Sequence, residues 1–163
     1  MMKVRFANFE DAGLIVKLAH EIWPVVYVDV ISNEQISFML EQSYSISAIE
    51  NQMKEDHLFF ILESDSVAQG FASITKESNE IYKLHKLYIH QSLHGQGAGR
   101  FFITTLENYC REQGALEMVL NVNRNNKAKF FYKKMGYGII EVVDIPYYKY
   151  VLNDYVMVKN LAR

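Results

Sequence analysis

Residues 87–100 read Leu-Tyr-Ile-His-Gln-Ser-Leu-His-Gly-Gln-Gly-Ala-Gly-Arg, an apolar stretch followed by a glycine-rich turn and the start of a helical pattern. Three glycines in five residues let successive backbone N–H groups approach one anion. The helix that opens there adds about half a positive charge at its N-terminus, and Arg100 adds a formal charge. The stretch therefore predicts a phosphate or pyrophosphate site, the simpler alternative being a tight strand-to-helix turn.

The glycine spacing separates this loop from the common nucleotide-binding loops. A P-loop needs a Lys followed by Ser or Thr, and no such pair follows Gly99. A dinucleotide loop has the form G-x-G-x-x-G, whereas residues 95–99 give G-x-G-x-G. An enzyme that uses ATP or NAD(P)H is therefore the weaker interpretation.

Directly before the loop, the spacing of hydrophobic residues is typical of strands. Nearer the N-terminus, the spacing is typical of helices. Residues 58–63, 67–75 and 80–90 are rich in β-branched and aromatic residues and predict an antiparallel meander. Before them, residues 3–7 predict a short strand, and Asn8 can cap a helix. Two capping-box spacings follow, Ser32 with Gln35 and Ser47 with Glu50.

Downstream of the loop the helical period returns and then alternates with strands. We expect a helix from residue 100 that Gly114 ends, then a strand at 116–122, a helix at 126–135, and strands at 137–143 and 154–161. The predicted order is β-α-α-β-β-β-α-β-α-β-β. This order describes one α/β (α+β) domain over residues 1–163, with a mixed, mostly antiparallel sheet of about seven strands and about four helices.

Composition excludes several classes of protein. The chain has 163 residues, 50% of them hydrophobic, and a formal net charge of −2, which argues against a dedicated nucleic-acid binder. Apolar runs reach only about five residues, against about 20 for a membrane span. Acidic residues at 10 and 11 disfavour a signal peptide, and the single cysteine, Cys110, allows no internal disulfide, so we expect a cytoplasmic protein. The histidines at 85, 90 and 94 lack companions suited to binding a metal.

Two segments resemble the GNAT superfamily of acyl-CoA N-acyltransferases. The family's loop after its fourth strand has the form [Gln/Arg]-x-x-Gly-x-[Gly/Ala], and residues 94–99 look like it, with His94 in the first place. A histidine can still donate a hydrogen bond there, but it carries no fixed charge. The second segment, residues 126–137, resembles the family's Asn-x-x-Ala-x-x-Phe-Tyr-x-x-x-Gly-Phe, with Phe131-Tyr132 and Gly136-Tyr137 as its anchors.

The resemblance implies acetyl-CoA as co-substrate and no metal. Asn126, or Asn125 as the alternative, matches the asparagine that touches the pantetheine arm, although Asn126 is also a good helix cap. Tyr132 matches the tyrosine that protonates the departing thiolate, although it could be only a core aromatic. The cofactor-binding residues implied by the family are Leu87, Tyr88, Ile89, His94, Gly95, Gln96, Gly97, Ala98, Gly99, Arg100, Asn126 and Tyr132.

Direct acyl transfer also needs a base and an oxyanion site. An alkyl ammonium with a pKa of about 10.4 must lose a proton before it attacks. His85 stands where many family members place a carboxylate, so it is the predicted base, with Asp154 or Glu80 acting through water as alternatives. Backbone N–H groups near Tyr88 or Ile89 are expected to meet the oxyanion. Cys110 has no histidine partner in the helical pattern, which disfavours an acyl-cysteine route.

The predicted function is transfer of an acetyl group from acetyl-CoA to a primary amine of a small molecule or peptide. Charge is uneven, with nine acidic and four basic residues in 1–56 against three and seven in 97–135, which suits an amine and CoA phosphates respectively. The alternative is a non-catalytic acyl-CoA sensor of the same fold. An exposed last strand could pair with a second copy. Aromatic residues that could face an amine are Trp23, Tyr27, Phe38, Tyr44, Tyr147, Tyr148 and Tyr150.

Overall fold

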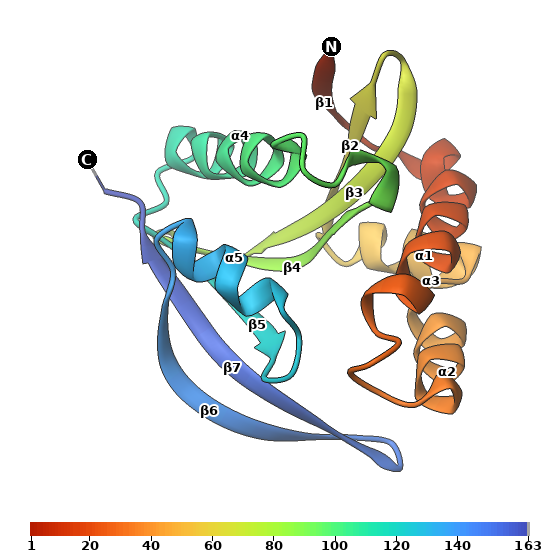
Figure 1. The fold of residues 1–163 in the computed structure, drawn as a ribbon. Helices are drawn as coiled ribbons and strands as arrows, with labels where there is room; N and C mark the ends of the chain where they lie inside the picture. The colour runs from red at the N-terminus through yellow and green to blue at the C-terminus, as the bar shows by residue number, and fades with distance from the viewer. Residues whose placement is uncertain (163) are drawn as a thin grey trace.

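The computed structural model describes residues 1–162, whose strands form one seven-stranded sheet in the order β1-β2-β3-β4-β5-β7-β6 (Figure 1). All neighbouring strands are antiparallel except β4 and β5, which are parallel. This confirms the predicted mixed, mostly antiparallel sheet. The strands are β1 (Met2–Phe6), β2 (Leu58–Ser64), β3 (Val67–Lys76), β4 (Ile81–Ile89), β5 (Glu117–Asn123), β6 (Gly138–Tyr147) and β7 (Tyr150–Asn160), and the helices are α1 (Ala12–Val26), α2 (Asn33–Ser43), α3 (Ile46–Lys54), α4 (Ala98–Glu112) and α5 (Ala128–Lys134).

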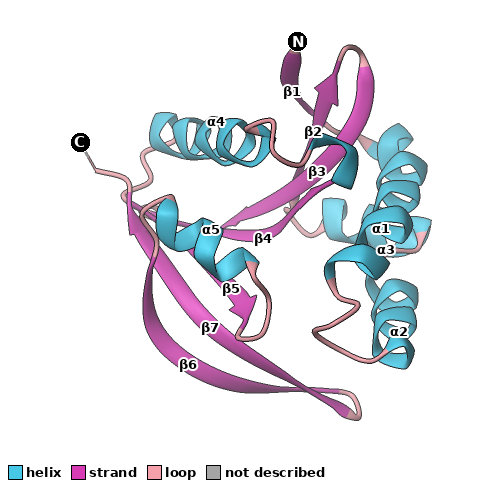
Figure 2. Cartoon of the chain, in the orientation of Figure 1, coloured by secondary structure: helices cyan, strands magenta, loops and turns pink. Residues whose placement is uncertain are grey.

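Helices cover both faces of the central strands, which explains why those strands are apolar on both sides (Figure 2). Strand β2 shows the alternation. Phe60 and Leu62 pack toward α4 and α5, whereas Phe59 and Ile61 pack toward α1, α2 and α3. Successive strand residues point to opposite faces, so a run of apolar residues fills two cores at once.

The N-terminal third holds three helices rather than two, which corrects the predicted order and raises the helix count to five. Asn8 and Ser32 cap as predicted, with the Ser32 hydroxyl accepting from the Gln35 N–H at 3.1 Å. The third helix starts earlier than the Ser47 box predicts. Ser45 has the extended backbone of a cap, and its hydroxyl accepts from the Ala48 N–H at 3.1 Å, so Ser47 already lies in the first turn.

The last strand is not exposed, which corrects a second expectation. Strand β7 pairs with β5 on one side and β6 on the other, so the edge strand at this end of the sheet is β6. Both strands also extend farther toward their hairpin than the predicted 137–143 and 154–161. Pro146 lies within β6, and an edge strand tolerates a proline because one side of it needs no partner.

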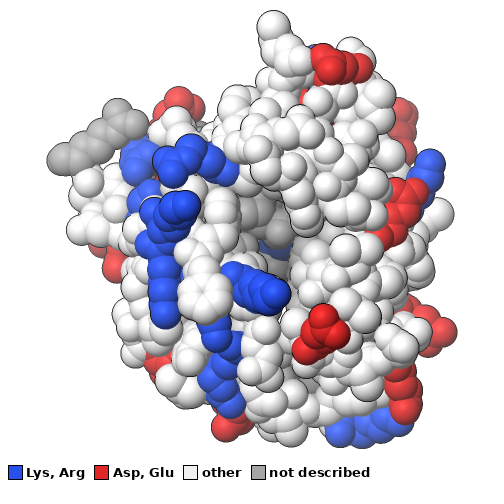
Figure 3. Space-filling model, viewed as in Figure 1, with Lys and Arg blue, Asp and Glu red and all other residues white. Residues whose placement is uncertain are grey.

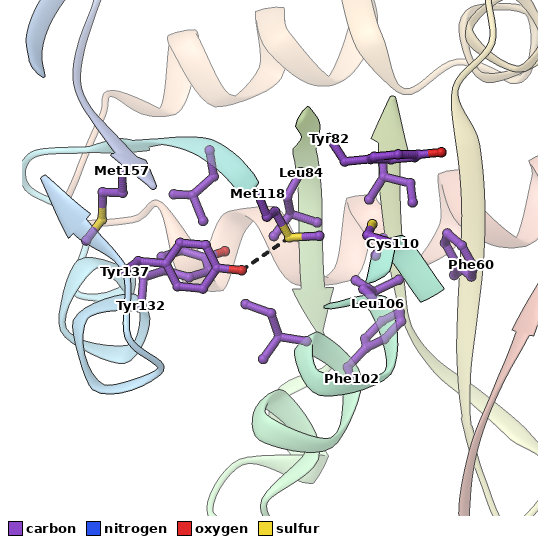
Figure 4. Close-up of a cluster of buried hydrophobic side chains, with 14 of the residues drawn as sticks. Phe60, Tyr82, Leu84, Phe102, Leu106, Cys110, Met118, Tyr132, Tyr137 and Met157 are labelled. Atoms are coloured by element: carbon purple, nitrogen blue, oxygen red, sulfur yellow. Dashed lines mark hydrogen bonds between the residues drawn. The ribbon is translucent and has the colours of Figure 1, made fainter. Parts of the chain in front are cut away.

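A buried carboxylate ties α4 to the C-terminal strands. Glu107 is 2% exposed and accepts from the Tyr137 hydroxyl at 2.8 Å and from Lys159 Nζ at 2.9 Å. The Tyr137 hydroxyl also lies 3.2 Å from the sulfur of Met118, and Figure 4 shows this contact with Tyr132 lying beside Tyr137. A carboxylate buried in this way is stable only while both of its donors remain.

Replacing Glu107 by Gln is therefore expected to lower the free energy of unfolding by about 2–3 kcal/mol, because a buried ammonium–carboxylate pair loses one charge. Urea unfolding measures the effect. Glu112→Gln, at the exposed end of the same helix, is the matched control and is expected to stay within about 0.5 kcal/mol of wild type. Equal stability of the two variants would show that the buried pair contributes nothing.

Candidate functional site

The two parallel strands at the centre of the sheet separate after four residue pairs. Strands β4 and β5 pair only from Ile81 with Glu117 to Leu84 with Leu120, and the remainder of each strand has no partner on that side. The separation begins at a bulge in β4, where Lys86 faces Ser73 and Leu84 faces Ile74, so that His85 is the extra residue. A cleft of about 790 Å³ opens at this point and appears as the hollow in Figure 3.

The far half of β4 directs backbone groups into this gap. The His90 N–H donates to the Gln69 carbonyl at 2.7 Å, so His90 and, two residues before it, Tyr88 face β3. Because an antiparallel ladder alternates, the N–H groups of Leu87 and Ile89 point the other way, toward the gap. Of the two positions expected to meet an oxyanion, Ile89 thus has its N–H on the cleft side, whereas the N–H of Tyr88 faces β3.

The glycine loop lines the cleft and leaves several backbone N–H groups unpaired within the described chain. Gly95 and Gly97 have φ values of +78° and +76°, a region that residues with a side chain avoid. Gly97 is the N-cap of α4 and supplies no capping side chain, and the N–H groups of residues 97–100 have no hydrogen-bond partner within residues 1–162. An added Cβ at Gly99 would lie 3.1 Å from the ring of Phe131, so this glycine allows α4 to approach α5.

The side chains of the loop differ in their direction. His94 and Arg100 are exposed and line the cleft. Gln96 does not line it, because its side-chain amide donates to the Ser92 carbonyl at 3.0 Å. Figure 3 shows a band of Lys and Arg beside the hollow on the side of α5, whose sequence and first flanking residues carry lysines at 127, 129, 133 and 134. The loop and this band together make one wall of the cleft positive.

Two residues of the second motif face the same cleft. The side chain of Asn126, which is 8% exposed, accepts from the Ala128 N–H at 2.9 Å, so it holds the first turn of α5 as a cap does, although the helix itself begins at Ala128. Tyr132 is 9% exposed and packs between the rings of Phe131 and Tyr137. Its hydroxyl makes no hydrogen bond in the described part of the chain, and burial raises the pKa of this phenol well above its usual value.

A carboxylate and two further phenols lie near Tyr132. Asp154 lines the cleft from β7 and accepts from the side-chain amide of Asn121 at 3.4 Å. Burial raises the pKa of Asp154 above the usual value of a carboxyl. The hydroxyls of Tyr27 and Tyr88 lie 2.8 Å apart, and both Asp154 and burial raise the pKa of Tyr27, to about 12.

His85 lines the cleft, but its ring has other neighbours. Its Nε2 lies 2.7 Å from the Thr75 hydroxyl, and its ring centroid lies 4.7 Å from that of His57. Burial lowers the pKa of His85 to about 3, so the ring is neutral at every physiological pH. Glu80 does not line the cleft. Cys110 is buried within α4, where burial raises the pKa of its thiol to about 12.

The structure thus brings together most of the residues predicted from the sequence. The predicted cofactor-binding residues all line one cleft except Gln96, and so does His85. Of the predicted aromatic residues only Trp23, Tyr27 and Tyr44 line it, because Tyr147, Tyr148 and Tyr150 pack around Phe38 on α2. The polar residues of the cleft that sequence reasoning missed are Gln35, Ser43, Lys86, Asn121, Asn123 and Lys134.

No group of three or more His, Cys, Asp or Glu side chains in residues 1–162 is placed to hold a metal ion. None of the helices in the same range combines the length and the apolar character that a membrane span requires.

Comparison with known proteins gives concordant matches. A family model described as an acetyltransferase (GNAT) domain matches residues 27–144. The spermidine N(1)-acetyltransferase of Thermoplasma acidophilum is 26% identical over 144 residues, which cover 85% of this chain and 89% of that protein. The L-amino acid N-acyltransferase MnaT of Escherichia coli is 24% identical over 143 residues, which cover 85% and 80%.

A solved structure matches the fold over almost its whole length. The crystal structure of the PaiA N-acetyltransferase from Thermoplasma acidophilum in complex with coenzyme A has a TM-score of 0.82 to this chain, at 26% identity. The match covers 98% of this chain and 99% of that one.

Proposed function

Because the chain belongs to the GNAT acetyltransferase family, we propose that it transfers an acetyl group from acetyl-CoA directly to a primary amine. The observation that carries this proposal is the glycine loop with unpaired N–H groups at the mouth of two separated parallel strands. The related structure that was solved with coenzyme A supports the choice of donor. The loop lacks the lysine of an ATP-binding P-loop, and it lacks the glycine spacing of a dinucleotide-binding loop.

Each chemical group of the donor, acetyl-CoA, has a suitable partner in the cleft. The pyrophosphate of CoA accepts from the N–H groups of residues 97–100 at the positive end of α4. The pantetheine arm carries amides, which can pair with the backbone edges of β4 and β5 that face the gap. Asn126 also lines the cleft. The lysines around α5 supply charge for the remaining phosphate.

The reaction then proceeds by direct attack. The neutral amine adds to the thioester carbonyl, forming a C–N bond and a tetrahedral oxyanion. The N–H of Ile89 is placed to stabilise this oxyanion, because it points into the gap and has no partner strand there. The intermediate collapses with loss of the C–S bond, and the Tyr132 hydroxyl gives its proton to the departing thiolate. The raised pKa of Tyr132 keeps that proton on the phenol until the thiolate forms.

The amine proton needs an acceptor, and the geometry favours Asp154 over His85 for this role. Asp154 is a carboxylate on the cleft wall with a raised pKa, which brings its basicity closer to working pH. His85 is neutral, but a pKa of about 3 makes it a weak base, and its Nε2 is already engaged with Thr75. We therefore assign His85 to the support of the β4 bulge and Asp154 to the amine, directly or through water.

The acceptor class rests on chemistry and on the related proteins. The name of one relative specifies spermidine and that of another an L-amino acid, and both are amines. The buried walls of Trp23, Tyr27 and Tyr44 suit a small acceptor that enters from the side of α1 and α2. A small-molecule amine is thus favoured, and the non-catalytic sensor is the alternative that the assays below test.

Donor binding is tested by thermal unfolding with acetyl-CoA, ATP and NADPH in parallel. A ligand at 100 times its Kd stabilises the fold by about 2.7 kcal/mol, and we expect this shift with acetyl-CoA alone. Gly97→Asp is expected to abolish the shift, because Asp tolerates the positive φ but places a carboxylate where the pyrophosphate binds. Gly13→Ala on α1, where an added Cβ meets nothing within 4 Å, is the control that should keep it. A shift with a nucleotide and none with acetyl-CoA would refute the proposal.

A further inference from the structure

We propose that the acceptor carries a carboxylate beside its amine, as an α-amino acid does, and that Lys86 is the residue that binds this carboxylate. The inference rests on the proposed function, since it concerns the acceptor half of the same cleft. It goes further because it names one class of amine acceptor and the residue that selects it.

Lys86 is a cation without a counter-ion. It lies on β4 beside the bulge and lines the cleft. Its Nζ lies 5.5 Å from the ring centre of Tyr44 and 5.8 Å from that of Phe59, with no carboxylate within 4.0 Å and no hydrogen bond anywhere in residues 1–162. Burying an ammonium group with only aromatic rings as partners costs free energy. Binding of an anion at Lys86 would offset that cost.

Three other half-buried cations have carboxylate partners, whereas Lys83 and Lys129 form no ion pair within residues 1–162. Arg5 binds Asp11 and Glu63, Arg124 binds Asp144, and Lys159 binds Glu107. The titratable groups whose pKa is affected by the charge of Lys86 are His57 and His85. Both are bases, and burial keeps both neutral. Burial lowers the pKa of Lys86 to about 8, so the ammonium form still predominates at pH 7. The acidic residues whose charges act on His57 are Glu55, Glu77 and Asp56, and none of them forms an ion pair with Lys86 within residues 1–162.

A second donor beside Lys86 also lacks a partner. The indole Nε1 of Trp23 is buried and makes no hydrogen bond within the described residues, and Trp23 lines the cleft. The ring centres of Trp23 and Tyr44 lie 5.3 Å apart; the indole is close enough to lower the pKa of the Tyr44 phenol, yet outside normal hydrogen-bonding geometry. Trp23 and Lys86 therefore contact the same tyrosine ring, and both are donors in need of an acceptor.

Among residues 1–162, the lining of the cleft thus contains one carboxylate, Asp154, and one half-buried, unpaired ammonium, Lys86. Asp154 on β7 is the carboxylate for the amine, and the cations whose charges act on it are Arg124 and Lys83, not Lys86. Because both side chains line the cleft, an acceptor with an amine and a carboxylate has a partner of opposite charge for each group. A polyamine can satisfy only Asp154 and would meet repulsion at Lys86. We therefore expect spermidine to be a poor acceptor for this chain.

The test measures binding of acceptors to the enzyme–CoA complex, in which no reaction can occur. Calorimetry with the L-α-amino acids and their carboxamides compares ligands that differ only in the anion. The wild type is expected to bind the best amino acid roughly 30-fold or more tightly than its amide. Lys86→Met is expected to remove that preference, and Lys86→Arg to retain most of it. Lys76→Met, on the exposed end of β3, is the matched control and should behave as wild type.

Several results would overturn the proposal. They are equal affinity of the wild type for acids and amides, loss of both affinities together in Lys86→Met, or spermidine acetylated faster than every amino acid. If Lys86→Met does not fold, the comparison of acids with amides on the wild type still decides. Failure of the proposed function is distinguishable, because then acetyl-CoA itself does not stabilise the protein, whereas failure of this inference leaves acetyl-CoA binding and amine acetylation intact.

Discussion

Replacing Tyr132 by Phe is expected to lower kcat at least about 100-fold while the affinity for acetyl-CoA stays near that of wild type. Phenylalanine keeps the ring contacts with Phe131 and Tyr137 and removes only the hydroxyl, which has no protein partner among residues 1–162 to lose. The loss therefore reports on proton transfer to the CoA thiolate. Initial rates of thiol release, with acetyl-CoA binding measured separately, give both quantities.

A matched control removes a buried phenol outside the cleft. Tyr82 is 6% exposed in the core below α4 and does not line the cleft, so Tyr82→Phe should leave the rate within about twofold of wild type. A Tyr132→Phe variant as active as wild type would mean that Tyr132 is a core aromatic, and that another group protonates the thiolate.

Replacing Asp154 by Asn is expected to lower kcat/KM about 100-fold at pH 7 and to remove the acid limb of the pH–rate profile. The sign follows from the raised pKa of this carboxyl. Above that pKa Asp154 is ionised and accepts the amine proton, and below it the group is protonated and the rate falls. The limb of the wild type should therefore lie above the pH at which an ordinary carboxyl titrates.

Two other substitutions separate the possible bases. Asp144→Asn changes a carboxylate that also binds Arg124, at 2.7 Å, but is exposed on β6 and should leave the profile unchanged. His85→Gln is expected to cost less than about tenfold, because a neutral ring with a pKa of about 3 has little basicity to lose. If His85→Gln abolishes the acid limb and Asp154→Asn does not, His85 is the base.

Local signals sufficed to predict most of the fold. The glycine loop, the meander before it and the second motif each have patterns that depend on neighbouring residues, and the predicted family is confirmed. The start of the third helix was misplaced because Ser45 and Ser47 both look like caps, and only the backbone at Ser45 distinguishes them. The place of β7 between β5 and β6 depends on pairing between distant strands, which no local pattern encodes.

Site residues that belong to a sequence motif could be predicted. Site residues whose direction depends on the register of a strand could not. Gly97, Asn126 and Tyr132 occur in motifs, so their common location could be expected. Lys86 was missed because the bulge at His85 breaks the alternation of β4 and changes the face to which the following residues point. A bulge in a strand of ordinary composition has no clear sequence signal. The presence of Lys86 and Asp154 in one cleft is likewise a tertiary feature, since 68 positions in the sequence separate them.

The most direct test of the central claim is a single assay with acetyl-CoA and a panel of small amines, in which CoA thiol release and acetylated amine are measured together. We predict that thiol appears only when an accepted amine is present, in a one-to-one ratio with the N-acetylated product, and that the rate depends on both concentrations. Stabilisation by acetyl-CoA without thiol release for any amine would contradict the account and identify the protein as an acyl-CoA sensor.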